Sequence, residues 1–224
     1  MKRIISFIIF LFPIFILAQT SDTIKPKSIA IGLTYSPDFC YRITNTNSDN
    51  QWMKDQFDTL EVAKFGFTTG INLDYQFTQK ISLSTGILYS DKGEQLRSKI
   101  IPTIEKYVDH IHYLDIPLKV NYNIINKNTK IFISAGISSN LFLSSKILMQ
   151  KENSSSRELI IGNSEFSKLN FTSIIGAGLK TNFSPKWSFK FELIYRQSIT
   201  TVMDAPVKKY FYSIGSNCGL FYTL

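Results

Sequence analysis

Apolar and polar residues alternate along much of the chain. In YLDIPLKVNY (113–122), Leu, Ile, Leu, Val and Tyr occupy the even positions, and Asp, Lys and Asn are among the odd ones. A period of two places alternate side chains on opposite faces of a β-strand. The same period recurs in eight segments, so we predict strands at about 28–36, 65–78, 81–92, 107–124, 131–143, 169–183, 187–196 and 210–224.

The connections between these segments alternate in length. Short polar turns are predicted at 78–80, 125–130 and 184–186, and longer connections at 37–64, 93–106, 144–168 and 199–209. Short turns at one end and long loops at the other are typical of bacterial outer-membrane barrels. We therefore predict an all-β fold, an eight-stranded antiparallel up-and-down transmembrane β-barrel with four long extracellular loops.

The polar face of these strands is rich in glycines and amides, and aromatic residues of the apolar face collect near strand ends. Glycine at exposed positions would weaken a soluble sheet, whereas small residues suit the crowded interior of an eight-stranded tube. Aromatic residues at both ends match the girdles of membrane barrels. We interpret the apolar face as lipid-facing and the lumen as filled and non-conducting. A soluble lipocalin-like periplasmic carrier, with the faces reversed, is an alternative.

Charged residues on the polar face would have to be paired inside a filled lumen. The acidic residues Asp74, Asp115 and Glu192 are available to pair with basic residues of other strands. We predict a lumen charge network made of Asp74, Asp115, Lys119, Lys180, Lys190, Glu192 and Arg196.

Pro117 lies inside a predicted strand, although proline cannot donate a ladder hydrogen bond and a closed barrel has no free edge. We therefore expect a bulge or a locally broken ladder near residues 116–118.

The first residues have the layout of a secretory signal peptide. Lys2 and Arg3 precede an apolar run over 4–17, and Ala18 offers a small residue at a cleavage point. We predict a cleaved signal peptide at 1–18 and a barrel domain at 19–224, located in the cell outer membrane. Export argues against nucleic acid as a partner, so the formal charge of +8 suits anionic lipid head groups better.

Few residues suggest chemistry. Cys40 and Cys218 are predicted to be free thiols, and the chain contains no Cys/His cluster, so we expect neither a metal nor a cofactor. His110 and His112 share one face near a strand end, but no GxSxG or HExxH motif accompanies them. We expect no catalytic residues and no enzyme. An outer-membrane lipid-modifying enzyme that uses His110 or His112 is an alternative.

Three segments resemble one known family. YLDIPLKVNY (113–122) resembles the YLEIPLLLKY strand of PorT-like outer-membrane β-barrel proteins, with Asp115 keeping the charge of the usual Glu, and GILYSDKG (86–93) resembles their GLxYxxKG strand end. The glycine-alternating IIGAGLKTNF (174–183) also matches. The resemblance implies an eight-stranded outer-membrane barrel. Its founding members are associated with protein secretion, a role that these residues do not by themselves transfer.

Taken together, the sequence predicts an outer-membrane protein of structural or binding type. Its expected partners are outer-membrane lipid, the barrel-assembly machinery during insertion, and a protein that contacts the long loops. The amphipathic segment 210–224 has the form that such assembly machinery recognises, although it ends in Leu224 where Phe is usual.

Overall fold

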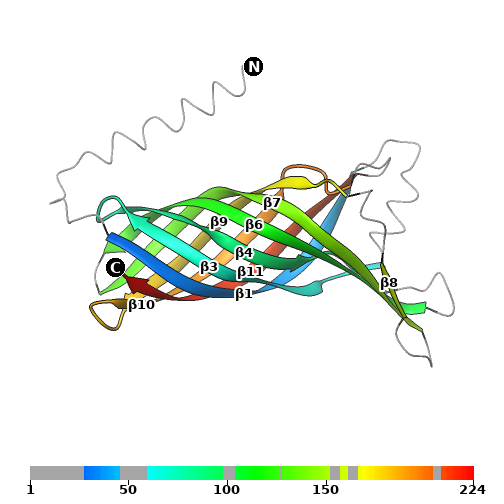
Figure 1. Cartoon of the computed structure of the whole chain (residues 1–224), viewed down its shortest axis with the longest axis horizontal. Helices are drawn as coiled ribbons and strands as arrows, with labels where there is room; N and C mark the ends of the chain where they lie inside the picture. The colour runs from blue at the N-terminus through cyan, green and yellow to red at the C-terminus, as the bar shows by residue number, and fades with distance from the viewer. Residues whose placement is uncertain are drawn as a thin grey trace, which may run out of the picture.

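The computed structural model describes residues 28–45, 60–97, 104–126, 128–151, 157–160, 166–203 and 208–224, and within them the long strands form one closed barrel (Figure 1). In chain order these strands are β1 (Ser28–Asn45), β3 (Lys64–Gln76), β4 (Ile81–Lys92), β6 (Ile104–Asn126), β7 (Thr129–Lys151), β9 (Leu169–Asn182), β10 (Trp187–Ser198) and β11 (Lys208–Thr223). Three short strands, β2 (Glu61–Val62), β5 (Gln95–Arg97) and β8 (Arg157–Ile160), extend the wall at one end.

Each long strand pairs antiparallel with the long strand that follows it in the chain. The ring closes where β1 pairs with β11, from Ala30 opposite Thr223 to Asn45 opposite Lys208. The predicted eight-stranded up-and-down barrel is therefore confirmed. Figure 1 shows the C-terminus at the same end as the start of β1, the end where the short turns lie.

The strand cores were predicted well, but two of the long strands continue well beyond their predicted ends. The segment predicted at 81–92 matches β4, whereas β1 runs to Asn45 and β7 to Lys151. The prediction for β1 stopped at Ser36 because Pro37 follows it. In the structure Pro37 pairs with Phe67 of β3, and only the ladder to β11 is interrupted, between Tyr35 and Asp38.

Pro117 interrupts one of its two ladders in the same way. Pairing with β7 continues through Pro117 opposite Ser138, but the pairs with β4 stop at Leu118 and resume at Asp115 with unchanged register. The expected broken ladder near residues 116–118 is confirmed, and no bulge forms there. A register shift between β6 and β7 occurs instead between His112 and Tyr113.

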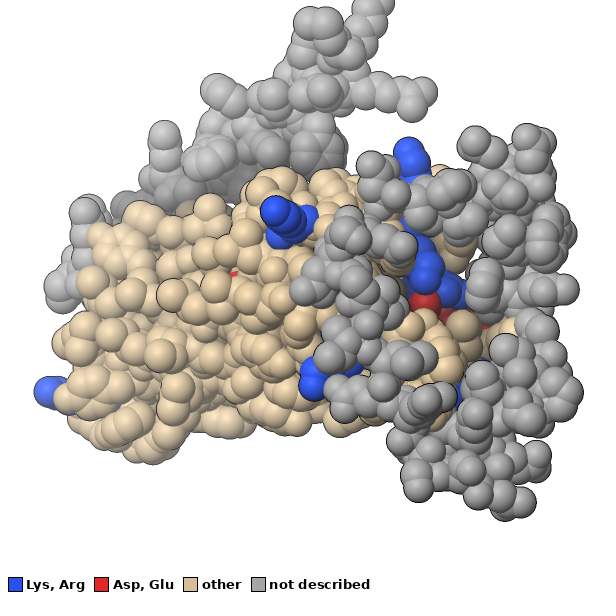
Figure 2. Space-filling view, turned by 45° about the vertical axis from the view of Figure 1, so that its right-hand side comes forward, with Lys and Arg blue, Asp and Glu red and all other residues tan. Residues whose placement is uncertain are grey.

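The two faces of the wall differ as predicted. Large apolar side chains such as Leu33, Ile137 and Leu193 are exposed on the outside, whereas Asp, Glu, Lys, Arg and Asn side chains are buried inside. Figure 2 shows a broad band of uncharged residues on the barrel wall, with most charged residues toward one end. The lipocalin-like alternative requires the apolar face to line the interior, and it is therefore wrong.

Aromatic pairs lie near both ends of the wall. Trp187 packs edge-on against Tyr222, with ring centroids 5.1 Å apart, near the short-turn end. Toward the other end the contacting pairs are Tyr35–Phe67, Phe67–Tyr89 and Tyr41–Tyr212. This placement fits the interfacial girdles of a membrane barrel.

No described helix has the length and hydrophobicity that a membrane span requires. The predicted signal peptide at 1–18 lies outside the described residues, as do large parts of the four long connections.

Candidate functional site

Ion pairs between distant strands fill the middle of the lumen. Lys119 of β6 donates to Glu192 of β10, with 2.7 Å between Nζ and Oε2. Lys180 and Lys190 each place Nζ 3.4 Å from Oδ2 of Asp74 on β3. The structure thus brings together five of the seven residues of the predicted lumen network.

The other two predicted residues, Asp115 and Arg196, have partners that the sequence analysis did not propose. Asp115 accepts from Lys92 Nζ at 2.8 Å, and Arg196 donates to Asp38 Oδ1 at 2.7 Å. Asp38 lies within the predicted connection 37–64, whereas in the structure it belongs to β1. A signal was present, since Thr34, Ser36 and Asp38 continue the polar face at alternate positions.

Glycines make room for these buried carboxylates. A Cβ added to Gly176 would lie 2.7 Å from Oε1 of Glu192. A Cβ added to Gly215 would lie 1.8 Å from Oδ1 of Asp38, closer than any real contact. Glycines at these positions of the polar face therefore leave room for the carboxylate side chains inside the lumen.

Aromatic rings also fill the lumen, which the sequence analysis missed. Phe132 and Phe221 are buried at positions that continue the polar face. Lys190 Nζ lies 4.9 Å from the centroid of Phe132, and Lys180 Nζ lies 5.3 Å from that of Phe221. A cation over an aromatic face is favourable. The parity of Phe132 and Phe221 within their strands was the available signal.

An apolar cluster lies inside the barrel near the end with the long connections. Its buried members are Ile111, Tyr113, Phe166, Val202 and Phe211. Phe142 joins it by stacking on Phe166, with centroids 4.9 Å apart. Residues of two long connections thus reach the interior and pack against strands β6 and β11.

A second charge cluster lies beyond the apolar one. Glu94 pairs with Arg42 of β1 and with Lys209 of β11, the latter at 2.9 Å. Lys64 pairs with Asp91 at 2.6 Å. Glu94 thus joins the first and last strands of the barrel, and Lys64–Asp91 joins the successive strands β3 and β4.

The two histidines lie on the outer face of β6, and their rings stack with centroids 6.4 Å apart. His110 Nδ1 is 2.9 Å from Asp91 Oδ2, and His112 Nδ1 is 2.7 Å from the hydroxyl of Tyr89. Ser144 lies opposite His112 in the β6–β7 register. Among the described residues no serine hydroxyl is hydrogen-bonded to either imidazole.

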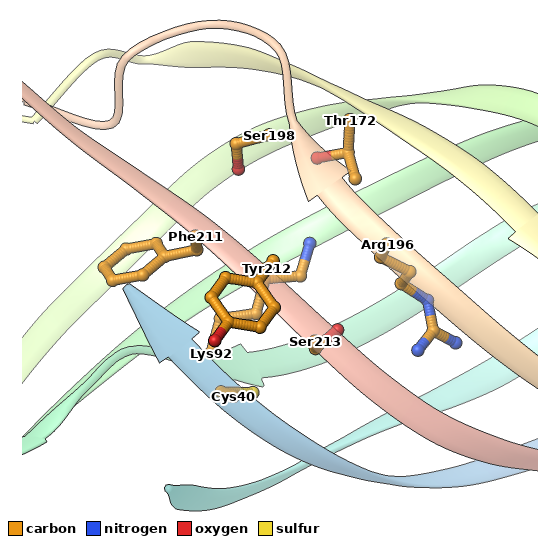
Figure 3. Close-up of a pocket in the computed structure, with 8 residues that line it drawn as sticks. All are labelled: Cys40, Lys92, Thr172, Arg196, Ser198, Phe211, Tyr212 and Ser213. Atoms are coloured by element: carbon orange, nitrogen blue, oxygen red, sulfur yellow. The ribbon is translucent and has the colours of Figure 1, made fainter. Parts of the chain in front are cut away.

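A small cavity lies in the lumen toward the end with the long connections (Figure 3). Lys92 and Arg196 line it together with Cys40, and its volume of about 10 Å³ holds no more than about one water molecule. Cys40 and Cys218 are both free, as predicted. The described residues contain no group of three or more His, Cys, Asp or Glu side chains that could hold a metal ion.

Residues 17–204 match the family described as outer membrane protein beta-barrel domain. The chain belongs to this family. As a member of the outer membrane protein β-barrel domain family, the protein is located in the cell outer membrane, which confirms the predicted location. The end of the barrel with the long connections is accordingly the extracellular end. A comparison with curated protein sequences finds no match.

Solved structures of outer-membrane barrels have a similar fold. Neisserial surface protein A (NspA) is 11% identical, with a TM-score of 0.46 over 87% of this chain and 98% of that chain. OprG from Pseudomonas aeruginosa is 11% identical, with a TM-score of 0.49 over 90% and 97%. The outer membrane protease OmpT from Escherichia coli is 7% identical, with a TM-score of 0.47 over 91% and 99%. At this level of identity the likeness concerns the fold alone.

Proposed function

We propose that this outer-membrane barrel is a structural or binding protein that presents four long extracellular loops on a filled, non-conducting lumen. The observation that carries the proposal is the set of ion pairs that cross the barrel interior, such as Lys119–Glu192 and Arg196–Asp38. An eight-stranded barrel has an interior only wide enough for side chains.

The packing at both ends of the lumen supports the same reading. Phe132 and Phe221 are buried on the short-turn side, and the cluster around Tyr113 and Phe211 is buried on the extracellular side. A path for ions would have to displace these rings as well as the ion pairs between them. The only surface left for recognition in this proposal is the loops and the outer wall.

Single-channel recording in a planar lipid bilayer tests the filled lumen. We expect the purified full chain to produce no conductance above that of the bilayer. Folding is checked on the same sample by gel mobility before and after boiling, because a compact barrel migrates differently when unheated. Stable ohmic steps from a correctly folded sample would contradict a non-conducting lumen.

The loops are proposed to contact a protein partner, while outer-membrane lipid surrounds the barrel and the assembly machinery acts during insertion. Nucleic acid is not among the proposed partners. A variant in which residues 46–59 are replaced by a short Gly/Ser linker tests the loop contact. We expect the variant to insert normally but to lose in-cell cross-links that the wild type forms through this loop. Unchanged cross-links would exclude this loop as the contact.

The PorT-like relationship is proposed as a finer assignment within the family. It is supported by the segment 113–122, which forms the middle of β6 and places Asp115 in the lumen. A role in protein secretion is not part of the proposal. Deletion of the gene with measurement of secreted proteins tests that role directly, and a specific secretion defect would add it.

An outer-membrane lipid-modifying enzyme is the second candidate, and one observation favours it. The carboxylate of Asp91 lies 2.9 Å from Nδ1 of His110, so it can orient this imidazole as a general base on the outer wall. The double variant His110→Gln/His112→Gln tests the candidate. Mass spectra of outer-membrane lipids should be identical for wild type and variant if the barrel is not an enzyme, and a lost lipid product would support the enzyme.

A further inference from the structure

The outer wall of the barrel has a groove at the extracellular end, beside the two histidines. Phe65, Val108 and Leu148 supply apolar surface, and Lys106 and His110 add polar side chains. The groove lies where β3 separates from β4. Their ladder ends at Phe67 opposite Asp91, and pairing resumes only at Val62 opposite Gln95.

Lys64 spans the gap in this ladder. Its side chain is buried, and Nζ donates to Asp91 Oδ1 at 2.6 Å and to the carbonyl oxygen of Lys92 at 2.8 Å. The second oxygen of Asp91 contacts His110. Both carboxylate oxygens of Asp91 are therefore engaged. Asp91 balances the positive charge of Lys64 and does not balance that of Lys106.

The sheet register surrounds the groove with further cations. Arg97 lies opposite Lys106 in the β5–β6 pairing, and Lys146 lies opposite His110 in the β6–β7 pairing. The same register places one acidic residue beside the groove, because Glu158 lies opposite Leu148 in the β7–β8 pairing. The wall on the opposite side of the barrel carries Tyr41 and Tyr212 at the same end, stacked with centroids 5.2 Å apart. That opposite side also carries Lys208 of β11, and the groove differs from it in combining several cations with an apolar floor.

We propose that this groove binds the phosphate group of an outer-leaflet lipid, with the adjoining acyl chain against Phe65, Val108 and Leu148. Cations near a membrane surface attract anionic lipid head groups, and long Lys side chains reach from an apolar wall to the head-group level. The groove lies just beyond the ring of Tyr89, which belongs to the extracellular aromatic girdle. An apolar floor with a cationic edge matches a lipid phosphate better than it matches a soluble anion.

Native mass spectrometry of the purified full chain in neutral detergent tests the proposal, with diphosphoryl lipid A as the probe. The double variant Lys106→Gln/His110→Gln should lower the fraction of lipid-bound protein about five-fold or more, because the loss of one cation near a surface, Lys106, costs about 1 kcal/mol and the loss of His110 removes a further polar side chain from the groove. The matched control is Lys208→Gln, which removes one charge at the same end of the opposite strand β11. It should change binding less than about two-fold.

Two further arms identify the ligand chemistry. Lipid A treated with phosphatase should bind about five-fold more weakly to the wild type, because the phosphate is the recognised group. Inorganic phosphate in excess should not displace the lipid. A second variant, Val108→Glu, replaces an apolar residue of the groove by a carboxylate and should weaken binding while Lys106 and His110 stay in place. Gel mobility before and after boiling shows that each variant is folded.

The proposal is overturned by any of four results. In the first, both groove variants bind lipid A as well as the wild type does. In the second, Lys208→Gln lowers lipid A binding as much as the groove variants do. In the third and fourth, dephosphorylated lipid A binds the wild type as well as lipid A does, or inorganic phosphate displaces lipid A completely. The last result would assign the cations to a free phosphate site. None of these results depends on conductance or on the loops, so the proposed function can fail or succeed independently.

Discussion

Replacing Glu192 by Gln tests whether the lumen ion pairs stabilise the barrel. Glu192 has no exposed surface. Its Oε2 accepts from Lys119 Nζ at 2.7 Å, and its Oε1 accepts from the hydroxyl of Ser134. Gln has nearly the same volume and keeps an acceptor for Ser134. The substitution therefore removes one negative charge and replaces the oxygen that faces Lys119 by an amide NH2 group.

The expected loss of stability comes from the positive charge that stays buried after the substitution. Lys119, whose side chain is 7% exposed, would keep its charge inside the lumen without its carboxylate partner. Breaking a buried pair by removing one partner costs about 3–5 kcal/mol, because the other charge stays buried. With the single amide oxygen of Gln toward Ser134, the amide NH2 faces the ammonium of Lys119 and accepts no hydrogen bond from it, so we expect a loss of about 3–5 kcal/mol in the free energy of unfolding.

The assay is urea unfolding of the barrel in lipid vesicles, followed by tryptophan fluorescence. Lys119→Met and the double variant Lys119→Met/Glu192→Gln complete a double-mutant cycle. We expect the double variant to lie within about 1.5 kcal/mol of the wild type, because neither charge is left alone. A loss below about 1 kcal/mol for Glu192→Gln, or additive losses in the cycle, would refute the reasoning.

Three further substitutions give expected outcomes in the same unfolding assay. Gly176→Ala should lower the free energy of unfolding by about 1–3 kcal/mol, because the new methyl group would lie 2.7 Å from the buried carboxylate of Glu192. The control Ala177→Val, on the lipid-facing side, should leave the free energy of unfolding unchanged. Leu118→Arg, midway along the lipid-facing side of β6, should lower the free energy of unfolding by about 2–4 kcal/mol. The control Ile124→Arg, at the short-turn end, should lower it by only about 0–1 kcal/mol. Equal losses for the two variants would contradict the assigned membrane position. Tyr113→Phe should leave stability unchanged or raise it, because the buried Tyr113 hydroxyl has no hydrogen-bond partner among the described residues, and a loss above about 1 kcal/mol would reveal a partner.

The sequence predicted the strands wherever local alternation was uninterrupted. The segment 81–92 was placed correctly, and β9 begins at the predicted Leu169. The prediction for β1 ended too early because a strand residue directs its N–H to one neighbour, so a proline interrupts one ladder and leaves the other intact. Pro37 and Pro117 each lose pairing with one neighbour and keep it with the other. The order and register of the strands in the closed sheet decide which neighbouring strand loses its pairs at each proline.

The candidate sites show the same division. The histidine pair and the charged residues were found from the sequence, but Asp91 was not connected to either histidine. Asp91 lies on β4, opposite His112 in the register of the β4–β6 pair. The alternation of apolar and polar residues within each strand does not specify which residues of β4 and β6 lie opposite each other.

The sequence by itself determined that eight two-faced strands must form, with bulky apolar residues on one side and small or charged residues on the other, because side-chain direction in a strand has a period of two. It also indicated seven of the residues that carry charge into the lumen, but not Asp38 or Lys92. Only the tertiary structure decided their partners, as in Lys119 with Glu192, 73 residues apart, and Arg196 with Asp38, 158 residues apart. Such pairs form across the interior after β1 meets β11, so their geometry depends on closure and on the stagger of the strands, which local pattern does not encode.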